Sequence, residues 1–269
     1  MEKVALISGA SRGIGYETAL KFAEQGYRIA VMARDEHELV KLQGIAESKW
    51  GVEVLIVAGD LADSAYWKTA VETTVARWGR VDVLVNNAAW RTIDTLKTMP
   101  LDDWERTVRI CLTAPAFLAK YAAAAMERQQ DTGVIINISS VMSQRAGGYS
   151  PAYIACKGGM ESLTYEMATC YGRDGIRVVG VSPGNVQTAM SGDYQDVKGT
   201  NISKQLEAEM NEMTPLGRAA SPREIAELVA WLASDQASFI TGTTILADGG
   251  FSHNFNSYAS KKLQFPQAF

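Results

Sequence analysis

The first thirty residues contain the pattern that most restricts how this chain can fold. A short apolar run at residues 4–8 leads into a turn with glycines at positions 9, 13 and 15. Apolar residues then recur at helical spacing over 16–25, and a second apolar run follows at 28–33. Strand, glycine-rich turn, helix and strand form a βαβ unit. A glycine turn alone is only a loop, but in this setting it predicts a dinucleotide site, because glycine admits a close pyrophosphate and a helix start offers N–H donors.

The alternation of strand and helix continues along the chain. Helices are predicted at residues 35–49, 64–78, 101–128 and 151–173, and further strands at 52–57, 81–85, 133–138, 176–181 and 243–247. Apolar strands that alternate with helices form a mostly parallel sheet that is covered on both faces. The predicted fold class is therefore α/β, a three-layer, doubly wound Rossmann fold with a seven-stranded sheet. No linker or repeat interrupts the pattern, so residues 1–251 are expected to form a single domain.

Three later segments carry other signals. Residues 187–213 are polar, contain methionine and show no clear strand, which is typical of an insertion that covers a site, so we predict a substrate lid there. The sequence Ser221-Pro222-Arg223-Glu224 is a capping box that predicts the start of a helix. Residues 252–269 are aromatic and carry no charge except Lys261 and Lys262. We expect this tail to pack on its own domain or on another subunit.

Composition and charge argue against several classes of protein. The 269 residues carry a formal net charge of −4, whereas a nucleic-acid surface requires a basic stripe. No uninterrupted apolar run approaches the ~18 residues of a membrane span, and the N-terminus lacks the apolar region of a signal peptide. Three cysteines without metal-ligand spacing and only two histidines argue against a zinc site. We therefore expect a cytoplasmic protein with reduced thiols that acts on a small molecule, without metal, nucleic acid or membrane.

Tyr153 and Lys157 stand four residues apart in the predicted helix at 151–173. This spacing places both side chains on one face of the helix, where the ammonium favours the phenolate form of the tyrosine. By itself such a pair is more often part of a solvated helix face. Its interpretation depends on the rest of the chain.

Seven short motifs occur in the order and spacing of a known family. They are Ser8-Gly9-Ala10-Ser11-Arg12-Gly13-Ile14-Gly15, Asp60-Leu61, Asn86-Asn87-Ala88-Ala89, Ile138-Ser139-Ser140, Tyr153-Ile154-Ala155-Cys156-Lys157, Ser182-Pro183-Gly184 and Asp248-Gly249-Gly250. On these motifs the chain resembles the short-chain dehydrogenases/reductases over nearly its whole length, residues 4–251. Within that family it is most similar in general to 3-oxoacyl-carrier-protein reductases and to sugar or polyol dehydrogenases.

The resemblance implies an oxidoreductase that transfers a hydride between NADP(H) and a ketone or secondary alcohol. Ser140, thirteen residues before Tyr153, is expected to bind the substrate oxygen, while Ser139 is expected to be a buried hydroxyl at the strand end. Tyr153 is expected to give or take the proton. Lys157 is expected to favour the phenolate and to hold the nicotinamide ribose. The cofactor supplies the hydride, so the protein mainly orients and polarises.

The resemblance also assigns residues to the cofactor. The glycine turn is expected to meet the pyrophosphate, Asp60 and Leu61 the adenine, and Asn87 the riboses. The full set of expected cofactor contacts is Gly9, Ser11, Arg12, Gly13, Ile14, Gly15, Arg34, Asp60, Leu61, Asn87, Ala88, Tyr153, Lys157, Pro183, Gly184, Val186 and Thr188. For Asp60 an ordinary turn residue is the competing interpretation.

The end of the second strand bears on the choice between NAD and NADP. An acidic residue there would bind the adenosine ribose and repel a 2′-phosphate, but this chain has Ala33 followed by Arg34. Together with Arg12, this arginine favours NADP through charge-assisted, bidentate contacts with the phosphate. The competing interpretation is that Arg34 forms a surface ion pair with Asp35.

Two departures from the family pattern concern the proton path. Cys111 stands where the family usually has an asparagine that helps to order a water leading to the lysine, so the relay is expected to be altered. Cys156, next to Lys157, replaces a common serine. A reactive thiol is one interpretation of Cys156, and a small buried residue is the other.

The substrate is expected to face a set of residues around the catalytic group: Trp90, Arg91, Gln144, Arg145, Tyr149 and Asn185. Arg91 and Arg145 suit an acidic or hydroxylated substrate, although surface arginines are the ordinary explanation for both. A 3-oxoacyl thioester and a sugar or polyol are the two substrate classes considered.

A different class of function is a non-catalytic NADP(H)-binding sensor or scaffold, for which Cys111 is the only support. The resemblance further implies a homo-oligomer, a homotetramer or dimer, in which the helix bearing Tyr153 packs across subunits.

Overall fold

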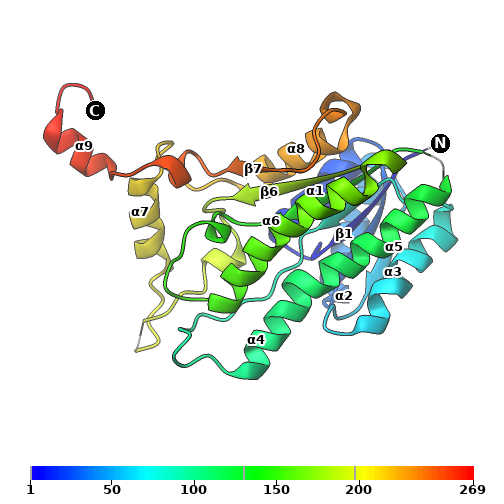
Figure 1. Ribbon diagram of the computed structural model, residues 1–269, viewed down its shortest axis with the longest axis horizontal. Coiled ribbons are helices and arrows are strands. Elements are labelled where there is room, and N and C mark those ends of the chain that lie inside the picture. The colour runs from blue at the N-terminus through cyan, green and yellow to red at the C-terminus, as the bar shows by residue number, and fades with distance from the viewer. Residues whose placement is uncertain (1, 130, 197) are drawn as a thin grey trace.

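One parallel sheet forms the centre of the molecule. The computed structural model describes residues 2–129, 131–196 and 198–269. Its seven strands lie in the order β3-β2-β1-β4-β5-β6-β7, and each neighbouring pair is parallel (Figure 1). The strands are β1 (Val4–Ser8), β2 (Arg28–Ala33), β3 (Val54–Ala58), β4 (Val83–Asn86), β5 (Gly133–Ile138), β6 (Ile176–Pro183) and β7 (Thr243–Ala247). The predicted doubly wound α/β Rossmann fold is confirmed.

Helices cover both faces of this sheet. On one face lie α1 (Gly13–Glu24), α2 (Glu36–Trp50) and α8 (Pro222–Ala233), and on the other α3 (Ser64–Trp78), α5 (Ala114–Gln129) and α6 (Pro151–Tyr171). The remaining α-helices of the described residues are α4 (Leu101–Val108), α7 (Ser203–Met213) and α9 (Tyr258–Gln264). Side chains alternate between the two faces of a strand, and β1 shows this directly. Ile7 packs with Phe22 and Ile225 beneath α1, α2 and α8. Leu6 packs on the other face, in the core beneath α3, α5 and α6.

The ends of several helices follow from their sequences. Asp35 caps α2 by accepting a hydrogen bond from the backbone of Glu38, and a glycine in the left-handed conformation, Gly51, ends this helix. The predicted capping box at Ser221 is present, with reciprocal hydrogen bonds between Ser221 and Glu224. The predicted helix at 101–128 is not regular, because a π-turn at Arg109–Thr113 separates α4 from α5.

The stretch from α4 to α5 also bears on the membrane question. By length and composition, Leu101–Gln129 is long and apolar enough to cross a membrane, and half of its most apolar window is buried inside the domain. Core helices of soluble proteins meet the same criterion. Its apolar face is therefore accounted for by packing against the sheet, where Leu118 and Met126 are fully buried.

The parallel arrangement places the functional motifs on one edge of the sheet. The chain runs outward from β1 to β3 and then returns to β4, next to β1, so the strand order reverses between these two strands. In doubly wound sheets ligands bind outside the carboxyl ends of the strands at such a switch point. The glycine turn follows β1, and Asn87 and Ser140 come just after β4 and β5.

The two later segments form short helices rather than strands. The segment 187–213 contains a 3₁₀ turn at Ala189–Ser191 and the helix α7. The tail continues past β7 into α9, which lies beside α7 and projects away from the sheet (Figure 1). Asn254 donates a hydrogen bond to the Met213 carbonyl at the end of α7, at 2.7 Å. Phe255 and Leu263 nevertheless remain 92% and 88% exposed.

Candidate active site

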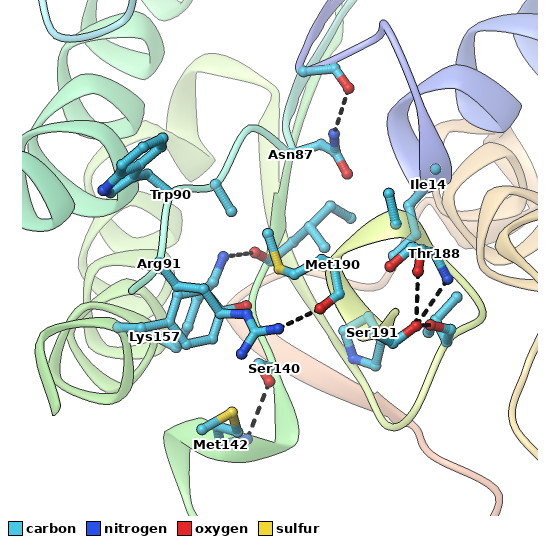
Figure 2. Close-up of a pocket in the computed structure, with 18 of the residues that line it drawn as sticks. Ile14, Asn87, Trp90, Arg91, Ser140, Met142, Lys157, Thr188, Met190 and Ser191 are labelled. Carbon is cyan, nitrogen blue, oxygen red and sulfur yellow. Dashed lines mark hydrogen bonds between the residues drawn. The ribbon is translucent and has the colours of Figure 1, made fainter. Parts of the chain in front are cut away.

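A cavity of about 660 Å³ lies along the carboxyl ends of the strands, from the glycine turn to α7. It brings together the three predicted catalytic residues, Ser140, Tyr153 and Lys157. All but one of the predicted cofactor residues also line it, namely Gly9, Ser11, Arg12, Gly13, Ile14, Arg34, Asp60, Leu61, Asn87, Ala88, Pro183, Gly184, Val186 and Thr188. Residues that are far apart in the sequence therefore share one space (Figure 2).

Gly15 is the predicted cofactor residue outside the cavity lining, and its place in the turn explains why. A Cβ at this position would overlap the carbonyl oxygen of Gly9 and the amide nitrogen of Asn87. That amide nitrogen donates to the carbonyl oxygens of Ser8 and Gly9, at 2.9 and 3.1 Å. Gly15 is therefore needed for packing the turn against the loop after β4, rather than for direct contact with a ligand.

The glycine turn has the form that an anion requires. Gly9 and Gly13 have φ values of +69° and +61°, which side chains rarely adopt. Arg12 caps α1 without a side-chain hydrogen bond to the helix, so the N–H groups of the first turn are not occupied by their own cap. A bare helix start behind a close-packed glycine turn fits the pyrophosphate of a dinucleotide.

Ser140 lies between β5 and a 3₁₀ turn at Val141–Ser143. Its hydroxyl oxygen accepts a hydrogen bond from the backbone N–H of Met142 at 3.2 Å (Figure 2). The buried carboxylate of Glu161 supports this turn by accepting from the Ser143 hydroxyl at 2.6 Å. It also accepts from Ser139, whose hydroxyl is 3.3 Å away and whose side chain is turned into the protein interior.

Tyr153 and Lys157 occupy successive turns of α6. The Lys157 ammonium lies 5.3 Å from the centre of the Tyr153 ring, and both residues are buried. Lys157 Nζ donates to the carbonyl oxygen of Ile138 at 2.6 Å, which holds the ammonium against the end of β5. The pair is thus part of the cavity and not a solvated helix face.

Cys111 lies in the π-turn between α4 and α5. Its sulfur accepts a hydrogen bond from the backbone N–H of Trp90 and donates one to the Trp90 carbonyl, both at 3.2 Å. Burial raises the pKa of Cys111, and it raises that of Cys156 to about 12. These values favour the interpretation of Cys156 as a small buried residue over that of a reactive thiol.

A group of basic and aromatic side chains lies where the adenosine end of a dinucleotide would bind. The guanidinium of Arg34 lies 5.6 Å from the Trp90 ring centre, and that of Arg106 lies 4.8 Å from it. Within the described residues Arg34 forms no ion pair with Asp35, which caps α2 instead. Asp60 accepts from the backbone of Ala62 at 2.9 Å and pairs with Arg106 at 3.1 Å. The Asp60 carboxylate therefore stabilises its own turn, as expected if Asp60 is an ordinary turn residue.

The predicted substrate residues fall into two groups. Trp90, Arg91, Arg145, Tyr149 and Asn185 line the cavity. Gln144 is absent from the described lining of the cavity. Its amide donates to Glu161 at 3.2 Å, because the 3₁₀ turn after Ser140 directs the side chain toward α6.

Both predicted arginines are engaged by distant segments of the chain instead of standing free at the surface. Only 5% of the Arg91 side chain is exposed, and it pairs with Asp193 at 3.0 Å. Nη1 of Arg145 donates to the carbonyl oxygens of Phe251 and Ser252, at 3.1 and 2.6 Å. Arg145 therefore anchors the start of the tail.

The sequence predicted a lid at 187–213 but did not identify which of its apolar residues line the cavity. The additional residues that face the cavity on this side include Met142, Met190, Tyr194, Leu206, Met210 and Met213. Most of them belong to the segment 187–213, whose methionine content was the one available signal.

Comparisons with known proteins identify the family of this chain. A family model described as Enoyl-(Acyl carrier protein) reductase matches residues 9–252. The short chain dehydrogenase/reductase astE of Aspergillus oryzae is 35% identical over 251 residues, covering 93% of this chain and 95% of that protein. The chain belongs to the short-chain dehydrogenase/reductase family.

Two further relatives indicate the kind of reaction found among similar chains. Trans-4-hydroxycyclohexanecarboxylate dehydrogenase of Sinomonas cyclohexanicum is 37% identical over 254 residues, covering 93% of this chain and 92% of that protein. The crystal structure of acetoin dehydrogenase YohF from Salmonella typhimurium superposes with a TM-score of 0.85 at 33% identity, covering 96% of this chain and 100% of the other. This short-chain dehydrogenase/reductase is thus an oxidoreductase of a family that uses NAD(P).

Proposed function

We propose that this protein interconverts a ketone and a secondary alcohol with NADP(H), and that Tyr153 is its acid/base. The observation that carries the proposal is the meeting of Ser140, Tyr153 and Lys157 in the same cavity as the glycine turn. The sequence relation to dehydrogenases of a hydroxycyclohexane acid and of acetoin supports a small secondary alcohol or ketone as the substrate. A 3-oxoacyl thioester or a sugar or polyol also fits this reaction class.

The bound nicotinamide supplies or accepts the hydride in this reaction. Ser140 donates a hydrogen bond to the substrate oxygen and orients the carbonyl toward Tyr153. In the direction of reduction Tyr153 gives its phenolic proton to the developing alkoxide, and in oxidation it takes that proton back. Lys157, fixed by the Ile138 carbonyl, places its positive charge beside the Tyr153 ring. The buried surroundings strengthen both interactions.

The preference for NADP rests on the arginines at the adenosine end. Arg12 and Arg34 line the cavity. Ala33 ends β2, and the residue that follows it is Arg34 instead of an acid. The exposed Arg34 guanidinium lies 5.6 Å from the Trp90 ring centre, and this contact supports the preference because it holds the charge at the mouth of the cavity. The segment 187–213 is proposed to be the substrate lid, since Met190, Leu206 and Met210 cover the cavity.

The proposal also includes a homo-oligomeric assembly and a cytoplasmic location. Met160 and Met167 of α6 are buried in their own domain, so they are not available to another subunit. Phe117 of α5 and Tyr165 of α6 are 38% and 43% exposed, and these apolar groups support a homo-oligomer built on the outer faces of the two helices. The three cysteines are free thiols, which suits the reducing cytoplasm.

Replacing Tyr153 by Phe tests the proposed reaction. On a panel of ketones with NADPH, Tyr153→Phe is expected to lower kcat by about a thousandfold, because the proton donor is lost. Binding of NADPH, followed by fluorescence, should persist. Tyr171→Phe, at the far end of α6, is the matched control and should keep its activity. NADPH binding without turnover by the unmodified protein on the whole panel would instead favour the sensor or scaffold function.

A further inference from the structure

Arg91 is buried and held in place on three sides. Its Nη2 donates to the carbonyl oxygen of Met190 and pairs with Asp193 at 3.0 Å. The flat face of the guanidinium lies 4.7 Å from the centre of the Tyr194 ring. Only 5% of the side chain is exposed, so these contacts leave Arg91 no route to solvent without disrupting the segment 187–213.

The second terminal nitrogen of Arg91 is different. Nη1 is buried and has no hydrogen-bond partner among the described residues. Figure 2 shows the guanidinium between Met190 and Ser140, with the nitrogen that is not bonded to Met190 directed toward the side on which Ser140 lies. A buried charged donor without an acceptor is unfavourable, and in native structures such a group is satisfied by a ligand or by ordered water.

The side chains around Nη1 limit which group can accept its hydrogen bond. The cavity lining on this side combines the apolar Met142 and Met190 with the hydroxyl groups of Tyr149 and Tyr194. Arg145 also lines the cavity, but its Nη1 is taken by two backbone carbonyls of the tail. No described side chain accepts a hydrogen bond from Nη1. Its acceptor is therefore water or a polar atom of the bound molecule, and a substrate oxygen at this position would replace the water.

We infer that Nη1 of Arg91 binds a second oxygen of the substrate, close to the carbonyl that reacts. This inference rests on the proposed function, in which Ser140 and Tyr153 hold the reacting oxygen. The substrate class is a ketone with an apolar skeleton and a nearby hydroxyl or second keto oxygen. A neutral oxygen is sufficient, because Asp193 already balances the charge of the guanidinium.

Matched substrates that differ by one hydroxyl group test this assignment. The measured quantity is kcat/KM for 2-hydroxycyclohexanone divided by that for cyclohexanone, with NADPH in excess. The wild-type ratio is expected to exceed about ten, since a site built to bond a hydroxyl discriminates against the analogue without it. Arg91→Met and Arg91→Gln are expected to lower the ratio at least about tenfold. Asp193→Asn keeps Nη1 in place and should retain the ratio within about threefold.

The outcomes separate the inference from the proposed function. If both ketones are reduced and the ratio in Arg91→Met equals that of the wild type, the assignment of Arg91 is wrong. A wild-type ratio near one overturns it even when neither variant folds. A third substrate, 3-oxocyclohexanecarboxylate, tests the choice of a neutral oxygen. If Arg91→Met lowers kcat/KM for this carboxylate by a larger factor than for 2-hydroxycyclohexanone, the choice of a neutral oxygen is wrong. If the wild type reduces no ketone at all, the proposed function itself has failed.

Discussion

Single residues at the cavity wall combine structural and chemical tasks. Asn87 is expected to meet the riboses, yet its amide nitrogen already holds the glycine turn through the carbonyls of Ser8 and Gly9. Cys111 departs from the family pattern, yet its thiol bonds both backbone groups of Trp90 and ties the loop after β4 to the π-turn. The thiol therefore has a defined positioning role, whatever it does to the proton path behind Lys157.

The two arginines at the adenosine end set the expected cofactor preference. The double variant Arg12→Ala/Arg34→Ala should lower the NADP/NAD ratio of kcat/KM by at least about a hundredfold, because each charge-assisted bond to a 2′-phosphate contributes roughly 1.5–3 kcal/mol. Steady-state kinetics with both cofactors measures this ratio. Arg128→Ala, an exposed arginine near the end of α5, is the control. An unchanged ratio in the double variant would remove the argument for NADP.

The three cysteines should differ in reactivity. Iodoacetamide at pH 8 is expected to modify the exposed Cys170 and to spare Cys111 and Cys156, whose pKa values are raised by burial. Mass spectrometry of the native protein gives the answer, and urea-unfolded protein is the control in which all three react. Modification of Cys156 in the native protein would restore the reactive-thiol interpretation.

The same pKa shifts predict how stability depends on pH. Unfolded thiols ionise near pH ~8.5, whereas burial raises the pKa of Cys156 to about 12 in the folded protein. The contribution of the Cys156 thiol to the free energy of unfolding is therefore fully present below pH ~8.5. It is lost as the pH rises from there toward about 12, because the thiol loses its proton in the unfolded protein but keeps it in the folded protein. Urea titrations of wild type and Cys156→Ala should diverge in this range. The same pH dependence of the free energy of unfolding in both proteins would contradict the raised pKa of Cys156.

At the scale of elements, periodicity and motifs predicted most of what the structure contains. Buried strands read as continuous apolar runs, and β1, β2, β5 and β7 begin and end where the sequence pattern does. The π-turn at Arg109–Thr113 had no such signal, because one extra residue per turn leaves an apolar helix pattern nearly unchanged. The orientation of Gln144 had no sequence signal either, because a single 3₁₀ turn, held by Glu161, decides which way its side chain points.

The arginines show a second limit of sequence reasoning. Arg91 and Arg145 looked like surface residues, because arginine is usually exposed. Their partners are Met190 and Asp193 for one, and Phe251 and Ser252 for the other. These contacts join segments about one hundred residues apart, and no local pattern predicts them.

At the scale of the whole molecule, the tail links assembly to the cavity. Asn254 and Ala259 bond to the end of α7, which lines the cavity through Met210 and Met213. Deleting residues 254–269 is expected to raise KM about threefold or more, because α7 loses its support. Light scattering should also report whether the wild type has the mass of four chains of 29.2 kDa and whether the truncated chain keeps it. A shorter deletion of 266–269 is the control. If neither KM nor mass changes, the tail has no role in the site or the assembly.

The sheet order has a consequence for how the protein matures. The cavity needs the turn after β1, the loop after β4, the end of β5 and the residue Phe251 beyond β7. Parallel strands pair only through long crossovers, and such non-local pairing is slow to form. We therefore expect that an early folding intermediate does not bind the dinucleotide, since half of the predicted contacts come from each side of the reversal of strand order at β4. Recovery of cofactor binding after dilution from denaturant would thus mark the completion of the entire sheet.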